Sequence, residues 1–214
     1  MKVRSLILVS TMSLFATMAF AQKGELFGNY SYMQFNPTIN GLNSRALNGA
    51  GGGAQWNIKP MIGIKAEFQG YMSTETSVSV TSPIPGPNGG IIPVGTYKSN
   101  ATMFTYLFGP VVQLPGKRFR PFGEVLFGGM QTELYTQLNS AVIANGGKLD
   151  ASETQHPFTM AFGGGLDINV NKHVAVRVAQ MDWVLTRFTN PWTDTNNQNS
   201  FRYLGGIVFK FGGD

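Results

Sequence analysis

The sequence predicts an all-β fold, an eight-stranded antiparallel up-and-down transmembrane β-barrel. Apolar and polar side chains alternate with a period of two, which is the side-chain period of a β-strand. Charged residues make up only 13% of the 214-residue chain, about half of the fraction in an average soluble domain. The expected links between strands also alternate between short turns and long loops, which is the pattern of barrels that cross a membrane.

The first 21 residues have the order of a secretory signal peptide. The basic start MKVR is followed by an apolar stretch over 6–20 and by Ala-Phe-Ala at 19–21, as in the n-region, h-region and cleavage site of exported proteins. The apolar stretch is shorter than the roughly 20 residues that a membrane-spanning helix needs. We therefore expect cleavage after Ala21, with residues 22–214 forming one barrel domain.

Eight strands are expected in this domain, and the third and the last show the alternation most clearly. In the third, Ile64 and Phe68 fall on one face and Lys65 and Glu67 on the other. In the last, residues 201, 203, 205, 207, 209 and 211 form an apolar face opposite Arg202. The expected ranges are, in order, 25–35, 48–58, 61–73, 98–113, 120–138, 157–170, 173–188 and 200–211.

The sixth expected strand contains three consecutive glycines at 163–165, ahead of Asp167. A glycine-rich turn before an acidic residue can bind phosphate, but here Phe158, Phe162 and Leu166 alternate with the glycines and Asp167, which favours a strand. Glycines also cluster at 51–53, 128–129 and 205–206, each within another expected strand. We expect them to leave room for neighbouring bulky side chains or to let a closed sheet bend.

The links between the strands differ in length. Short turns are expected around 59–60, 114–119 and 171–172, and long loops at 36–47, 74–97, 139–156 and 189–199. With an even number of strands, both termini then lie at the short-turn, periplasmic end. A soluble eight-stranded barrel is the structural alternative. Low charge, unequal links and aromatic residues near the expected strand ends favour the membrane barrel.

Several segments resemble the small outer-membrane β-barrel family of OmpA-like proteins. They are LFGNYSYM at 26–33, TYLFGPVV at 105–112, RPFGEVLFGG at 120–129, AFGGGLDINVNKHVAVRVAQMDWVLTRF at 161–188 and FRYLGGIVFKF at 201–211. The resemblance implies an outer-membrane location, contact with lipid and lipopolysaccharide, and recognition of the last strand by the barrel-assembly machinery. Nothing in the sequence resembles the separate peptidoglycan-binding domain of larger members, and we expect a monomer.

If the apolar faces point to lipid, seven charged side chains face the barrel interior. Because isolated buried charges cost several kcal/mol, we expect them to form a salt-bridge network, with Arg177 or Arg202 as the partner of Asp167. Such a network could be a plug of paired side chains, since eight strands leave an interior that side chains can fill, or it could line a polar conduit. The seven residues are Lys65, Glu67, Glu124, Asp167, Arg177, Arg202 and Lys210.

Groups that could carry catalysis are few. The chain has no cysteine and two histidines, and it carries no spaced set of metal ligands and no phosphate-binding motif. His173 is expected in a solvated turn. His156 lies near Ser152 and Glu153 in sequence, and a Ser–His pair with an acidic residue could activate a nucleophile, which keeps a lipid-modifying enzyme as an alternative. We predict no enzymatic activity and no cofactor.

The long loops are the remaining candidates for binding. The 74–97 loop is rich in proline and glycine, and the 189–199 loop contains Trp192, a large apolar residue that could contact a partner. The weak basic excess predicts no nucleic-acid partner. The sequence therefore predicts an outer-membrane barrel with a role in envelope integrity or surface interaction, with a narrow porin-like channel as the main alternative.

Overall fold

A computed structural model describes residues 24–36, 44–72, 76–80, 83–85, 91–92, 94–99, 102–132, 156–187 and 197–212. The expected signal peptide lies outside the described residues, as do Ser152, Glu153 and Trp192. Among the described residues there is no helix long and apolar enough to cross a membrane.

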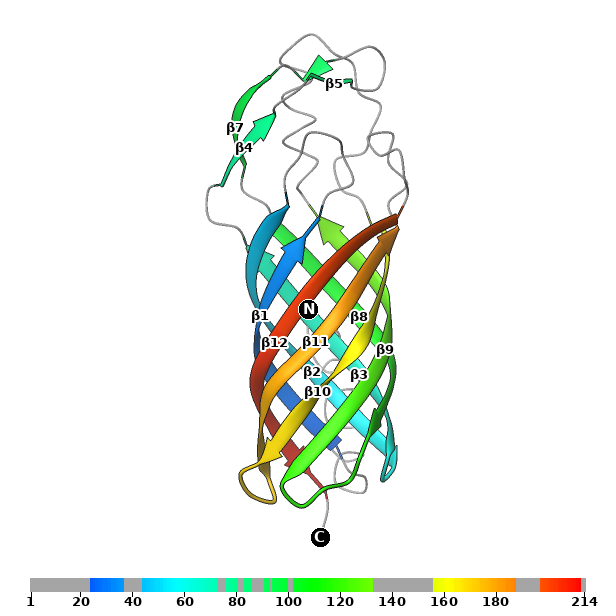
Figure 1. The fold of residues 1–214 in the computed structure, drawn as a ribbon. Coiled ribbons are helices and arrows are strands. Elements are labelled where there is room, and N and C mark those ends of the chain that lie inside the picture. Colours follow the sequence, from blue (N-terminus) through cyan, green and yellow to red (C-terminus); the bar gives the residue numbers. More distant parts are fainter. Residues whose placement is uncertain are drawn as a thin grey trace, which may run out of the picture.

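Eight antiparallel strands close into a barrel (Figure 1), which confirms the predicted fold class. Each strand pairs with its neighbours along the chain, and β1 closes the barrel by pairing with both β2 and β12. The strands are β1 (Gly24–Phe35), β2 (Arg45–Lys59), β3 (Ile62–Met72), β8 (Thr102–Gln113), β9 (Phe119–Thr132), β10 (Phe158–Asn169), β11 (Val174–Arg187) and β12 (Asn197–Phe211).

The links between strands have the predicted asymmetry. The turns at 60–61, 114–118 and 170–173 lie at one end of the barrel, which we call the short-turn end (Figure 1). The strands joined by the longer links have their other ends at the opposite end, which we call the loop end. Gly24 pairs with Phe211, so the first and last barrel strands begin and end at the short-turn end. This is the arrangement expected for a barrel with an even number of strands.

The structure corrects the expected boundaries on the loop side. The strand expected at 98–113 begins at Thr102, because residues 98–99 belong to β7 (Gly95–Ser99), which pairs with β4 (Thr76–Val80). The expected loop at 74–97 thus contains a hairpin, with β5 (Ile84–Pro85) and β6 (Ile91–Ile92) paired near its tip. Strand β2 begins at Arg45 rather than 48, and β9 ends at Thr132, so residues 133–138 lie outside the described part.

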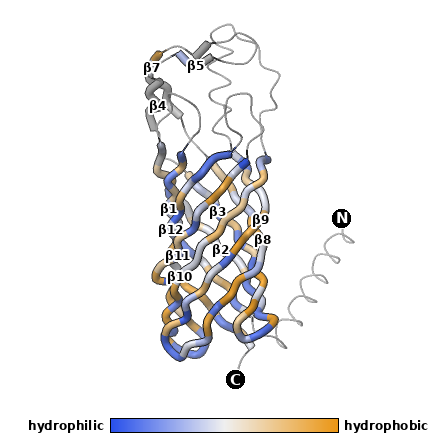
Figure 2. The backbone as a smooth tube through the Cα atoms, turned by 45° about the vertical axis from the view of Figure 1, so that its right-hand side comes forward, coloured by the Kyte–Doolittle hydropathy of each residue, from blue (hydrophilic) through white to orange (hydrophobic). Residues whose placement is uncertain are grey.

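The outer face of the barrel is apolar and the inner face carries the charges. Large side chains such as Leu26, Phe108 and Phe162 are about half exposed on the outside, whereas Lys65 and Glu67 are fully buried inside. Figure 2 shows hydrophobic and hydrophilic residues alternating along the strands. A soluble barrel would have the opposite distribution, since its outer face meets water. The exposed apolar face therefore supports a lipid-facing barrel.

Candidate functional site

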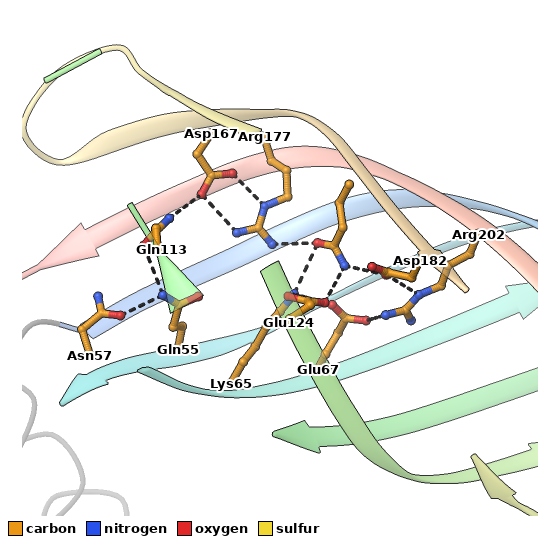
Figure 3. Close-up of polar contacts among 11 residues, drawn as sticks. Gln55, Asn57, Lys65, Glu67, Gln113, Glu124, Asp167, Arg177, Asp182 and Arg202 are labelled. Carbon is orange, nitrogen blue, oxygen red and sulfur yellow. Dashed lines mark hydrogen bonds and ion pairs between the residues drawn. The ribbon is translucent and has the colours of Figure 1, made fainter. Parts of the chain in front are cut away.

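The charged side chains in the middle of the barrel form one network (Figure 3). Lys65 on β3 contacts two carboxylates, with its Nζ 2.8 Å from Glu67 Oε2 and 2.9 Å from Glu124 Oε2. Arg202 on β12 contacts Glu67 at 2.6 Å and Asp182 on β11 at 2.7 Å. All of these side chains are 4% exposed or less, so their charges are balanced by each other rather than by water.

A second ion pair lies nearer the short-turn end. The Nε of Arg177 donates to Asp167 Oδ1 at 2.8 Å, and its Nη2 donates to Oδ2 at 3.2 Å. Of the two expected partners of Asp167, Arg177 is thus the one that the structure shows. Gln180 joins this pair to the rest, because its Oε1 accepts from Arg177 Nη1 at 3.0 Å and its Nε2 donates to Glu124 at 2.9 Å and to Asp182 at 2.8 Å.

A β-bulge in β11 brings Arg177 and Gln180 to the same side of the sheet. The register with β12 shifts between these two residues, and Val178 points outward. Before the bulge the odd-numbered residues of β11, such as Arg177, face inward, and after it the even-numbered ones do. Arg177 and Asp182 therefore both lie inside. The carbonyl group of Val178 accepts a hydrogen bond from the Tyr203 hydroxyl group at 2.8 Å. Strict alternation counted from Arg177 assigns Asp182 to the lipid face, which is why sequence reasoning missed both Gln180 and Asp182.

Two phenylalanine rings lie among the interior cations. Lys65 Nζ is 4.7 Å from the centroid of the Phe27 ring, and the Arg177 guanidinium carbon is 4.4 Å from that of Phe122. These distances are those of cation–π contacts. The rings need the glycines of the neighbouring strands, since a Cβ added at Gly53 or Gly165 would come 2.7 Å from Phe27 or Phe122 respectively. The glycines therefore leave room for bulky side chains, as expected.

The network continues to the mouth of the barrel at the short-turn end. Gln113 Nε2 donates to Asp167 Oδ2 at 3.3 Å, and Arg120 contacts both Gln113 and Glu25. Lys210 lies apart from the ion pairs: its Nζ donates to Asn169 Oδ1 at 2.7 Å and to the carbonyl oxygen of Asn171 at 3.2 Å. It sits one residue before β12 ends, where the side chain faces the open mouth rather than the filled interior.

The interior near the loop end is filled differently. Large apolar or aromatic side chains that are 1% exposed or less occupy inward positions on β1, β2, β3, β8 and β9 there. Smaller polar side chains are buried beside them, namely Thr132, Thr159, Thr186, Gln198 and Ser200. We call this set the apolar level, and the network of Lys65, Glu67, Glu124, Asp167, Arg177, Gln180, Asp182 and Arg202 the charged level. The apolar level consists of Met33, Phe35, Leu47, Tyr71, Met103 and Met130.

The two histidines considered as candidate catalytic residues do not form part of a catalytic or metal site among the described residues. His156 is exposed just ahead of β10, and His173 is exposed in the turn between β10 and β11. Among the described residues, no group of three or more His, Cys, Asp or Glu side chains is placed to hold a metal ion. The charged level is thus the candidate that the described residues support.

Comparisons with known proteins agree with this fold. The outer membrane protein OprG from Pseudomonas aeruginosa matches with a TM-score of 0.56 and 10% identity, over 90% of this chain and 97% of that chain. Neisserial surface protein A matches with a TM-score of 0.55 and 9% identity, over 88% and 96%. Ail of Yersinia pestis, solved with the heparin analogue sucrose octasulfate, matches with a TM-score of 0.52 and 10% identity, over 89% and 99%.

At these identities the three structures show the fold alone. A search of curated proteins finds no match to this chain. The model of the outer membrane protein β-barrel domain matches residues 7–206, which is most of the sequence. The chain therefore belongs to the outer membrane protein β-barrel domain family.

Proposed function

We propose that this protein is a non-conducting, non-enzymatic barrel of the outer membrane, with a role in envelope integrity or in surface interaction. The observation that carries the proposal is the filling of the interior at two levels, one charged and one apolar. An ion would have to displace paired charges at the first and large buried side chains at the second, and both steps are costly.

The partners that we propose follow from the outer face and the long loops. The apolar outer face would contact membrane lipid and lipopolysaccharide, and the alternating end of β12 would be recognised by the barrel-assembly machinery. Ail was solved with a sulfated ligand, so a barrel of this fold is compatible with ligand binding. Because the closed barrel leaves no strand edge unpaired, a monomer is sufficient for its backbone hydrogen bonds.

Two experiments test this proposal. In planar bilayers, the folded protein is expected to show no discrete conductance. Discrete conductance that changes in Glu124→Gln would instead support a narrow channel. For surface interaction, deletion of residues 80–95 is expected to abolish binding of whole cells to a target surface while the protein still shows heat-modifiable mobility. Unchanged binding to every surface tested would leave envelope integrity as the role.

The enzyme alternative has its own test. Cells that overproduce the wild type and cells that overproduce His156→Ala are expected to have the same lipid composition. A lipid species that appears with the wild type and disappears with His156→Ala would contradict the proposal.

A further inference from the structure

The mouth of the barrel at the short-turn end forms a pocket of about 620 Å³. Its volume falls within the range of small-molecule sites, which is about 300–1,000 Å³. Polar and charged side chains from seven strands or turns line it, among them Glu25, Arg120, Asn169, Lys172 and Lys210. The pocket therefore brings together groups that are distant in sequence.

Lys210 is held in position at this pocket. Its Nζ donates to the side-chain oxygen of Asn169 at 2.7 Å. The side-chain nitrogen Nδ2 of Asn169 donates in turn to the carbonyl oxygens of Gly116 at 3.1 Å and Lys117 at 3.0 Å. Both acceptors of Lys210 are neutral, and Lys210 forms no ion pair with another residue of the described ranges. An ammonium group has three donors, so one N–H remains for a ligand.

Arg120 also lines the pocket and also has a hydrogen-bond donor that is not used within the described residues. Its Nη2 contacts Glu25 and Gln113, while its buried Nη1 has no hydrogen-bond partner in the part of the chain that the structure describes. Glu25 is the acidic residue that lines the pocket, and it is engaged by Arg120 and by Asn57 Nδ2 at 3.2 Å. Three Lys or Arg side chains and one carboxylate thus line the pocket.

The surroundings of the pocket add to this charge. Among the described residues of the short-turn end, Glu25 is the acidic one, whereas the basic ones are Lys59, Lys117, Arg118, Arg120, Lys172 and Lys210. A mouth with an excess of one sign of charge raises the local concentration of counter-ions. The four other carboxylates of the described barrel belong to the charged level and are paired there.

We propose that this pocket binds an oxyanion, the phosphate or carboxylate group of a periplasmic molecule, with Lys210 as the principal donor and Arg120 and Lys172 beside it. The pocket is larger than a single phosphate ion, so the group would be carried by a larger molecule. This site does not depend on whether the barrel conducts.

The test is a titration of the folded barrel in a non-ionic maltoside micelle, which contains no competing phosphate. Inorganic phosphate and acetate are added separately at constant ionic strength, and backbone amide chemical shifts of Asn169, Lys172 and Lys210 are followed. We compare the wild type with Lys210→Gln and Lys172→Gln. The control is Lys117→Gln, which removes the same charge at the same end from an exposed side chain that does not line the pocket.

We expect saturable shifts with at least one of the two anions. Lys210→Gln should weaken the affinity by about tenfold, the loss of one charge-assisted hydrogen bond, Lys172→Gln by less, and Lys117→Gln by less than about twofold. Saturation with phosphate alone assigns a phosphoryl ligand, and saturation with acetate assigns a carboxylate. Linear shifts with both anions would overturn the proposal. So would equal weakening by Lys117→Gln and Lys210→Gln in variants that keep heat-modifiable mobility.

Discussion

The charged level and the apolar level fill the same barrel by opposite chemistry. In the charged level, each side chain depends on particular partners, as when Arg202 contacts both Glu67 and Asp182. In the apolar level, side chains such as Met103 and Met130 are equally buried but need only volume and contact. Charged side chains inside a barrel therefore do not by themselves indicate a polar conduit. The stability of the protein should also respond differently to substitutions in the two levels.

The largest effect is expected where one charge of a pair is removed. Arg177→Met leaves Asp167 buried without its cation, and it should lower the free energy of unfolding by about 3–5 kcal/mol. The double variant Arg177→Met, Asp167→Leu should recover most of this loss, because the new apolar side chains can pack beside Phe27 and Phe122. Urea unfolding in lipid vesicles measures both. A double variant that loses as much as the sum of the two single variants would contradict the pairing.

In the apolar level, the cost should depend on volume alone. Met130→Ala creates a cavity and should lower the free energy of unfolding by about 2–5 kcal/mol. Met130→Leu keeps the volume and should cost less than about 1.5 kcal/mol. The same urea unfolding compares them. Equal losses for alanine and leucine would show that the methionine has a specific role rather than a packing role.

The smallest effect is expected at Thr105 on β8, an inward residue that is 1% exposed. Its Oγ1 has no hydrogen-bond partner among the residues that the structure describes. Replacing a buried unpaired hydroxyl group by a methyl group of the same shape removes a desolvation cost. Thr105→Val should therefore leave stability unchanged or raise it by about 1 kcal/mol. A clear loss of stability would indicate an ordered water bound to this hydroxyl group.

The fold was predictable because its main signal is local. The alternation of Ile64, Lys65 and Glu67 indicates a strand with one polar face. Closure of eight such strands is expected because a membrane leaves no unpaired strand edge, and the unequal links indicate which end is which. The hairpin of β4 and β7 was missed because its short segments lie in a sequence rich in proline and glycine.

The candidate site was predictable only in part. Asp182 and Gln180 lie inside because of a bulge in β11. The bulge exchanges the inward and outward positions of the residues that follow it, and no marked change in the hydropathy of the sequence accompanies it. The apolar level was missed for another reason. Where inward residues such as Met103 are as apolar as outward ones such as Phe104, the pattern no longer distinguishes the two faces. Both failures come from tertiary context rather than from local sequence preference.

The central claim is that the charged level and the apolar level each block the passage of ions through the barrel. It is tested by single-channel recording in planar bilayers of four proteins, after each is shown to be heat-modifiable. They are the wild type, a variant with Asp167→Ala and Arg177→Ala, a variant with Met103→Ala and Met130→Ala, and the combination of all four substitutions. We predict discrete conductance in the combined variant and none in the other three. Conductance in the wild type, or in the variant that lacks only the Asp167–Arg177 pair, would contradict the claim.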